Sequence, residues 1–131
     1  SLLESVQRKF TRRIPGLRNL SYRERIEFLG LETLEYRRLC YDLCMCFKMI
    51  RGDVNLDFHD FFKFVTHGLQ RNRHSHTFVL PNSRLDCRKH SYACRTVQPW
   101  NALSQEIIDA SNINVFKNLL KTCDFSDFLR Y

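Results

Sequence analysis

Glycine is scarce in this chain, with only four in 131 residues. Phosphate-binding loops and the nucleophile elbow of hydrolases need glycines at fixed spacing, and neither a glycine-rich phosphate loop nor a G-x-S-x-G motif occurs. We therefore expect neither a nucleotide-hydrolysing enzyme nor a hydrolase, and no cofactor.

Long apolar runs are also lacking, because no stretch approaches the roughly 20 residues of a membrane span. The opening Ser1-Leu2-Leu3-Glu4 meets a charge at once, so a signal peptide is not expected. We expect an intracellular protein, nuclear or cytoplasmic and not secreted, with no membrane partner. Because the sequence starts without Met and in a helical pattern, we expect it to be a piece of a longer protein.

The six cysteines lack the spacing of a metal site or a disulfide framework. Cys40, Cys44 and Cys46 fall in one predicted helix, where they cannot join one another with good disulfide geometry. A zinc knuckle would show a C-x-x-C pair, which is absent, and cysteine on an apolar helix face is usually a core residue. We expect reduced thiols and no metal.

What is present indicates a packed globule. Hydrophobic residues make up 44% of the chain and aromatic residues 13%, including eleven phenylalanines. The length predicts a single domain, residues 1–131, with two subregions, 1–68 (helical) and 77–131 (hairpin plus helices), joined by a basic loop at 69–76.

The net charge of +7 is confined to two segments. Residues 1–40 carry nine Lys or Arg against five acids, and residues 69–100 carry six against one. Residues 41–68 and 101–131 each carry three against four. Localised positive charge is the electrostatic signature of a partner with regularly spaced phosphates, although solubility also explains a modest excess.

Helical periodicity dominates the first half of the sequence. Residues 2–14 repeat Leu3, Val6, Phe10 and Ile14 on one face, with basic side chains elsewhere, until Pro15-Gly16. Such a basic amphipathic helix suits a membrane surface, a partner groove, its own core with phosphates outside, or no partner at all.

Two further helices are expected before residue 52. The S-x-x-E form of residues 21–24 is a capping box that begins a short helix, with Ile26 and Leu29 inward, and Gly30 ends it. In residues 33–52, Leu39, Leu43, Cys46, Phe47 and Ile50 recur at helical spacing and form an almost purely apolar face, which predicts the central helix of the core.

The second half is expected to mix helices with one hairpin. Asp57 caps a helix that ends at Gly68, and its four phenylalanines cannot all face one way. Residues 77–80 and 85–88 are expected to form a hairpin with a turn at 81–83. A helix from about residue 90 is expected to be kinked or ended near Val97 by Pro99, and a last helix to begin near Asn112. The predicted fold is mainly α, with five or six short helices and one short β-hairpin.

Residues 84–103 combine the only Trp with four basic side chains. In one interpretation Trp100, with Tyr92, Val97 and Leu103, belongs to the core and the basic side chains are its solvated side. In the other, the basic side chains contact an anionic polymer while the apolar residues hold the element rigid. Both remain open from the sequence.

Several segments, taken in order, resemble the C-terminal region of reverse transcriptases of LINE-type (non-LTR) retrotransposons, over roughly residues 2–121. They are residues 6–17 (VQRKFTRRIPGL), 21–26 (SYRERI) with 29–31 (LGL), 34–38 (LEYRR), 84–89 (RLDCRK), 97–103 (VQPWNAL) and 115–120 (VFKNLL). The resemblance implies a region downstream of the polymerase palm and thumb, where the enzyme holds template RNA and the primer-template duplex.

Catalysis in that family needs an adjacent pair of aspartates, which this chain lacks, and capping explains Asp53, Asp57 and Asp60 better. The chain is therefore expected not to be an enzyme, although the parent chain would be a reverse transcriptase. The expected partners are RNA or an RNA–DNA hybrid and the rest of the parent polymerase. The alternatives are a helical protein-interaction module and a non-functional remnant of a decayed retroelement.

The expected nucleic-acid contacts are the basic side chains of the two positive segments. They are Arg8, Lys9, Arg12, Arg13, Arg71, Arg73, Arg84, Arg88, Lys89 and Arg95.

Overall fold

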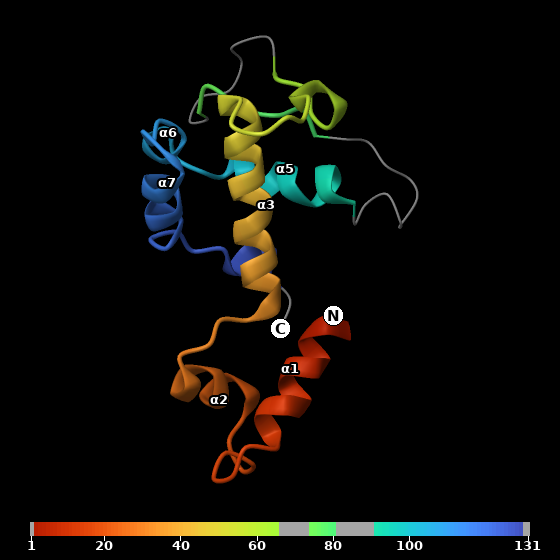
Figure 1. The fold of residues 1–131 in the computed structure, drawn as a ribbon, viewed down its shortest axis with the longest axis vertical. Helices are drawn as coiled ribbons and strands as arrows, with labels where there is room; N and C mark the ends of the chain where they lie inside the picture. The colour runs from red at the N-terminus through yellow and green to blue at the C-terminus, as the bar shows by residue number, and fades with distance from the viewer. Residues whose placement is uncertain (1, 66–73, 81–90, 130–131) are drawn as a thin grey trace. The chain divides into compact units, whose positions relative to one another are not determined.

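The structure is a computed structural model, and it describes residues 2–65, 74–80 and 91–129. It divides into two compact units, unit 1 (Ser1–Leu39 with Leu129–Tyr131) and unit 2 (Cys40–Phe128). The described residues are mainly helical and form no β-sheet (Figure 1). The helices are α1 (Leu2–Arg12), α2 (Tyr22–Leu29), α3 (Leu34–Arg51), α5 (Tyr92–Asn101), α6 (Gln105–Ile108) and α7 (Ile113–Leu120), with two 3-10 helices, η1 (Phe58–Asp60) and η2 (Ser126–Phe128).

Helix α2 begins and ends as its sequence predicts. Ser21 Oγ accepts from the Glu24 amide at 3.3 Å, and Glu24 Oε2 accepts from the Ser21 amide at 2.7 Å. These hydrogen bonds to Ser21 lower the pKa of Glu24, because they favour the charged carboxylate. Gly30 ends the helix with a φ of 62°, which an L side chain rarely adopts.

The face of α1 that packs against α2 is polar, so of the alternatives that the sequence left open, packing of the apolar repeat on the protein's own core is not seen among the described residues. Glu4 and Thr11 are 1% and 0% exposed, whereas Leu3 and Val6 are each 63% exposed and Phe10 is 67% exposed. The Tyr22 hydroxyl donates to Glu4 Oε1, and the Glu35 amide donates to Glu4 Oε2 at 3.2 Å. The polar side chains of α1 thus find hydrogen-bond partners inside unit 1, and the apolar repeat does not supply its core.

Unit 2 is built around the apolar face of α3, as the sequence predicts. Leu43, Phe47, Trp100, Phe116 and Leu120 are all at most 2% exposed. The rings of Phe47 and Phe116 stack with centroids 4.4 Å apart, and Trp100 lies 6.2 Å from Phe116. These contacts bring α3, α5 and α7 together.

The core interpretation of Trp100 is confirmed, since its ring is fully buried. Its indole Nε1 donates to the His76 carbonyl at 2.9 Å, and its own carbonyl accepts from His74 Nε2 at 2.8 Å. Of the two outcomes predicted at Pro99, an end of the helix near Val97 is not seen, because α5 continues to Asn101 and the Ala102 amide still bonds to the Gln98 carbonyl at 3.1 Å. Proline has no amide hydrogen to donate within the helix.

The predicted hairpin is not seen, and its return strand, residues 85–88, lies outside the described residues. Residues 77–80 do not form a strand of a sheet; Phe78 makes one isolated antiparallel bridge to Phe64. On one edge of this segment the Val65 amide donates to the Thr77 carbonyl at 2.9 Å. On the other edge the Phe78 amide donates to Asn101 Oδ1 at 2.8 Å, and Asn101 Nδ2 donates to the Phe78 carbonyl at 3.0 Å. Both edges of this short segment are therefore occupied by residues other than the predicted partner strand.

The helix predicted from Asp57 to Gly68 is wrong over the described residues. Asp57 does cap, accepting from the His59 amide at 2.9 Å, but only the three-residue η1 follows. The chain then extends, and Phe64 stacks on Phe58 while Phe62 stacks on Phe78, both with centroids 4.4 Å apart. An extended chain places alternate side chains on one face, which lets the rings pack inside unit 2.

Candidate anion-binding site

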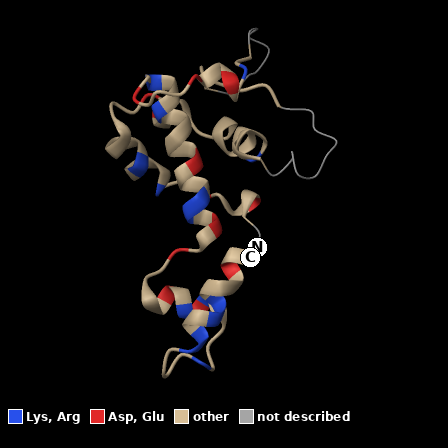
Figure 2. Ribbon diagram, turned by 45° about the vertical axis from the view of Figure 1, so that its right-hand side comes forward, with Lys and Arg blue, Asp and Glu red and all other residues tan. Residues whose placement is uncertain are grey.

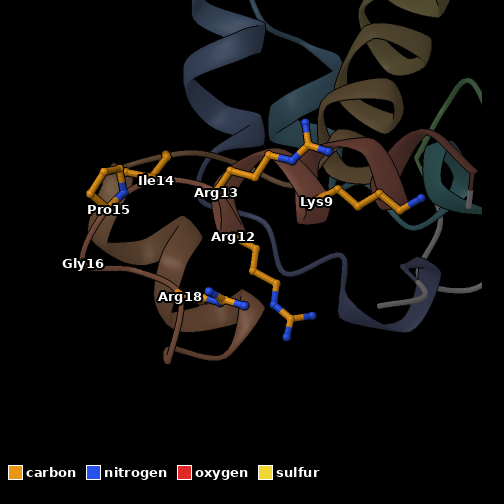
Figure 3. A pocket seen from close by; sticks show the side chains of 7 residues that line it. All are labelled: Lys9, Arg12, Arg13, Ile14, Pro15, Gly16 and Arg18. Carbon is orange, nitrogen blue, oxygen red and sulfur yellow. The ribbon is translucent and has the colours of Figure 1, made fainter.

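Five of the nine basic residues between Ser1 and Leu39 lie in the second half of α1 and in the loop to α2 (Figure 2). A pocket of about 490 Å³ opens there. It is lined by Lys9, Arg12, Arg13, Ile14, Pro15, Gly16 and Arg18, and we call it the basic pocket (Figure 3).

A tight turn brings the last of these cations back toward the helix. The Leu17 amide bonds to the Ile14 carbonyl at 3.2 Å, with Pro15 and Gly16 at the two central positions. Gly16 has a φ of 84°, the value that a type II turn requires at its second central residue. Leu17 is 5% exposed and anchors the turn in unit 1, so Arg18 returns beside the end of α1.

The pocket's cations come from the end of α1 and from the loop that follows it. In Figure 3 the side chains of Arg13 and Lys9 lie above those of Arg12 and Arg18. The turn formed by residues 14–16 lies at one side. No acidic side chain lines the pocket, and none of its four cations forms an ion pair within the described part of the chain. The result is a solvent-accessible concentration of uncompensated positive charge.

Buried Arg25 of α2 links the two segments that line the basic pocket, the end of α1 and the loop to α2. Arg25 is 6% exposed, its Nε donates to Thr11 Oγ1 at 3.1 Å, and one terminal nitrogen donates to the Arg8 carbonyl at 3.4 Å. The other terminal nitrogen donates to the Leu20 carbonyl, at the end of the loop that carries Arg18. Arg25 thereby links the last turns of α1 to the loop, so it fixes the pocket without lining it.

The predicted contact residues divide into three groups. Lys9, Arg12 and Arg13 line the basic pocket, and Arg8 lies beside it with its guanidinium 4.9 Å from the centre of the Tyr22 ring. Arg95 lies in unit 2, where its Nε donates to Asp42 Oδ2 at 2.7 Å. The remaining predicted residues, Arg71, Arg73, Arg84, Arg88 and Lys89, lie outside the residues that the structure describes.

Sequence reasoning missed Arg18 and Arg25. Arg18 directly follows the turn whose central residues are Pro15 and Gly16. This dipeptide is typical of a type II turn, which reverses the chain and so brings the next cation back to the end of α1. No comparable signal marks Arg25, because its burial depends on the polar contacts between α1 and α2.

The buried thiols are unsuited to nucleophilic chemistry. Burial raises the pKa of Cys46 to about 12, although its hydrogen bond to Tyr92 acts in the opposite direction. A thiol with so high a pKa carries almost no thiolate at neutral pH. Among the residues that the structure describes, no three His, Cys, Asp or Glu side chains are grouped as metal ligands would be.

Comparisons with known proteins identify no relative. No protein-family model, no curated protein and no solved structure matches the chain. Over the described ranges, none of the helices has both the length and the apolar character needed to cross a membrane.

Proposed function

We propose that this chain is the non-catalytic C-terminal segment of a retroelement RNA-directed DNA polymerase, and that its basic pocket contacts the phosphates of template RNA or of an RNA–DNA hybrid. The observation that carries the proposal is the gathering of Lys9, Arg12, Arg13 and Arg18 on one pocket without an acid. Arginine presents a planar fork of donors that matches a phosphate, and lysine adds a point charge.

The ordered resemblance to LINE-type reverse transcriptases supports the same proposal from the sequence. Residues 6–17, the longest of the resembling segments, contain six of the seven residues that line the pocket. The longest segment that resembles the family therefore contains most of the residues that line the basic pocket.

Binding of labelled RNA and of an RNA–DNA duplex tests the proposal. We compare the wild-type chain with a pocket variant (Lys9→Gln, Arg12→Gln, Arg13→Gln, Arg18→Gln). The matched control (Arg23→Gln, Arg37→Gln, Arg38→Gln, Lys121→Gln) removes the same charge from exposed positions outside the pocket. We expect the pocket variant to bind about tenfold or more weakly and the control to bind nearly as well as the wild type. Equal losses in both variants would show that only net charge matters, and an absence of RNA binding at low salt would reject the proposal.

The exposed apolar face of α1 favours a second candidate, a protein-interaction module. Leu3, Val6 and Phe10 follow the i, i+3, i+7 spacing with which a helix enters a partner's groove. A protein partner retained after nuclease treatment and lost in a Leu3→Gln, Val6→Gln, Phe10→Gln variant would support this candidate.

A further inference from the structure

We propose that the basic pocket recognises a terminal chain of phosphates, the 5′-triphosphate of an RNA or of a free nucleotide, in preference to an internal backbone phosphate. The inference rests on the proposed function, because it assigns a ligand class to the same site. It follows from the pocket's volume, its charge and the apolar residues among those that line it.

The volume suits a small group. The volume of about 490 Å³ lies within the range of pockets that hold small ligands, roughly 300–1,000 Å³. In Figure 3 the side chains of Arg13 and Lys9 lie above those of Arg12 and Arg18, and the turn of residues 14–16 lies at one side. A group of linked phosphates would reach cations at both levels, whereas a single phosphate would reach fewer of them.

The charge favours several phosphates in a small space. Four cations line the pocket without an acid. An internal phosphodiester carries one negative charge, whereas a terminal phosphate carries roughly −1.5 to −2 at neutral pH, and linked phosphates place more charge within reach of the same side chains. The terminal group therefore matches the pocket's charge more closely than one backbone linkage does.

Two apolar residues lie next to the cations. Ile14 and Pro15 line the pocket, and Ile14 is only half-exposed. A ribose or base joined to the phosphates would pack there while the guanidinium groups hold the phosphates. This division of one apolar wall and a few charged groups is typical of small-ligand sites.

The pocket is held in shape before any ligand binds. Arg25 ties Thr11 and the Arg8 carbonyl on α1 to the Leu20 carbonyl on the loop, and the turn at Gly16 is anchored by buried Leu17. A preorganised site loses less freedom on binding, so discrimination between ligands is expected to be measurable.

Two RNAs of identical sequence, one with a 5′-triphosphate and one with a 5′-hydroxyl, test the inference directly. We expect the wild-type chain to bind the triphosphate RNA about tenfold more tightly. If both bind equally, the terminal-phosphate inference is overturned while the proposed function stands. If neither binds at low salt, the proposed function falls as well.

Competition separates the two sources of a triphosphate. ATP and inorganic tripolyphosphate are each titrated against the bound 5′-triphosphate RNA. If both competitors displace the RNA, the phosphate chain alone is recognised. If only ATP displaces it, the nucleoside also contributes to binding, beside Ile14 and Pro15. Failure of both to compete at millimolar concentration contradicts a pocket built for triphosphates.

A single pair of variants links the preference to the pocket. Arg18→Gln removes a lining cation, whereas Arg23→Gln removes an exposed cation that is paired with Glu27 at 3.3 Å and does not line the pocket. We expect Arg18→Gln to lose most of the preference for the triphosphate RNA and Arg23→Gln to keep it. The opposite pattern would place the recognition elsewhere.

Discussion

Arg25 Nε donates to Thr11 Oγ1 over 3.1 Å, and this contact joins two polar side chains that are almost completely buried between α1 and α2. A buried cation is costly unless hydrogen bonds satisfy it, and Arg25 also donates to the Arg8 and Leu20 carbonyls. The guanidinium thus satisfies buried polar groups between the two helices, alongside the buried apolar residues Leu17 and Ile26, and it links the two segments that line the basic pocket.

Replacing this arginine should destabilise unit 1. In Arg25→Ala, Thr11 and the two carbonyls lose their donor in a buried setting, which costs about 2–4 kcal/mol. In Arg23→Ala only an exposed ion pair is lost, so we expect a change within about 0.5 kcal/mol. Chemical denaturation followed by circular dichroism measures both. Equal stabilities of the two variants would show that Arg25 is not a structural link.

A substitution on the polar face of α1 should destabilise the protein more than one on its apolar face, which is the reverse of what is usual for a helix. Val6→Gln changes a side chain that is 63% exposed, so we expect a change within about 0.5 kcal/mol. Glu4→Ala leaves the Tyr22 hydroxyl and the Glu35 amide without that acceptor, which costs about 1–3 kcal/mol. The free energies of unfolding of the two variants check this. A large loss from Val6→Gln with none from Glu4→Ala would mean that the apolar face is the packed one.

Local signals in the sequence located most helices. The Ser21–Glu24 capping box and Gly30 act through hydrogen bonds to near neighbours, and α2 begins and ends where they predict. Helix α3 ends at Arg51, next to the predicted stop at Gly52, and α7 begins at Ile113, next to the predicted start near Asn112. Trp100 is buried, in agreement with the core interpretation.

The structure differs from the sequence-based predictions where contacts between residues far apart in the chain outweigh the local sequence pattern. The apolar repeat of α1 points outward because Glu4 and Thr11 find polar partners in α2 and α3, which no periodicity reveals. Pro99 lies inside α5, and the segment after Asp57 is extended, with Phe62 stacked on Phe78. Three residues predicted as nucleic-acid contacts, Lys9, Arg12 and Arg13, line the pocket, but Arg18 was missed because its position depends on the turn at Gly16.

Trp100 should carry much of the stability of unit 2. Trp100→Ala removes a fully buried ring that stacks on Phe78 at 5.4 Å and donates to the His76 carbonyl, at a cost of about 3–5 kcal/mol. Because the variant lacks the only Trp, circular dichroism measures its unfolding. If the variant stays as stable as the wild type but loses RNA binding, the ring would be a stacking surface for bases and the core assignment would be wrong.

Unit 1 should lose stability at high pH through Tyr22. Burial, followed by the hydrogen bond to Glu4, raises the pKa of Tyr22 to about 12. A raised pKa in the folded state means that this contribution is complete below the ordinary tyrosine pKa of about 10 and is lost as the pH rises from there to about 12.

Ultraviolet titration of tyrosinate, together with unfolding at several pH values, checks the role of Tyr22. We expect Tyr22→Phe to lack the ionisation near pH 12 and to show a weaker dependence of stability on pH. The exposed Tyr41→Phe serves as the control. An unchanged titration in Tyr22→Phe would contradict the assignment.

The salt dependence of RNA binding tests the central claim, that the four cations of the basic pocket contact phosphates. On a plot of log affinity against log salt, each phosphate contact contributes about −0.7 for a single strand, so the pocket variant should show a slope shallower by roughly 3 if all four side chains bind phosphates. The control with Arg23, Arg37, Arg38 and Lys121 replaced should keep the wild-type slope. A pocket variant whose slope equals that of the wild type would contradict the account.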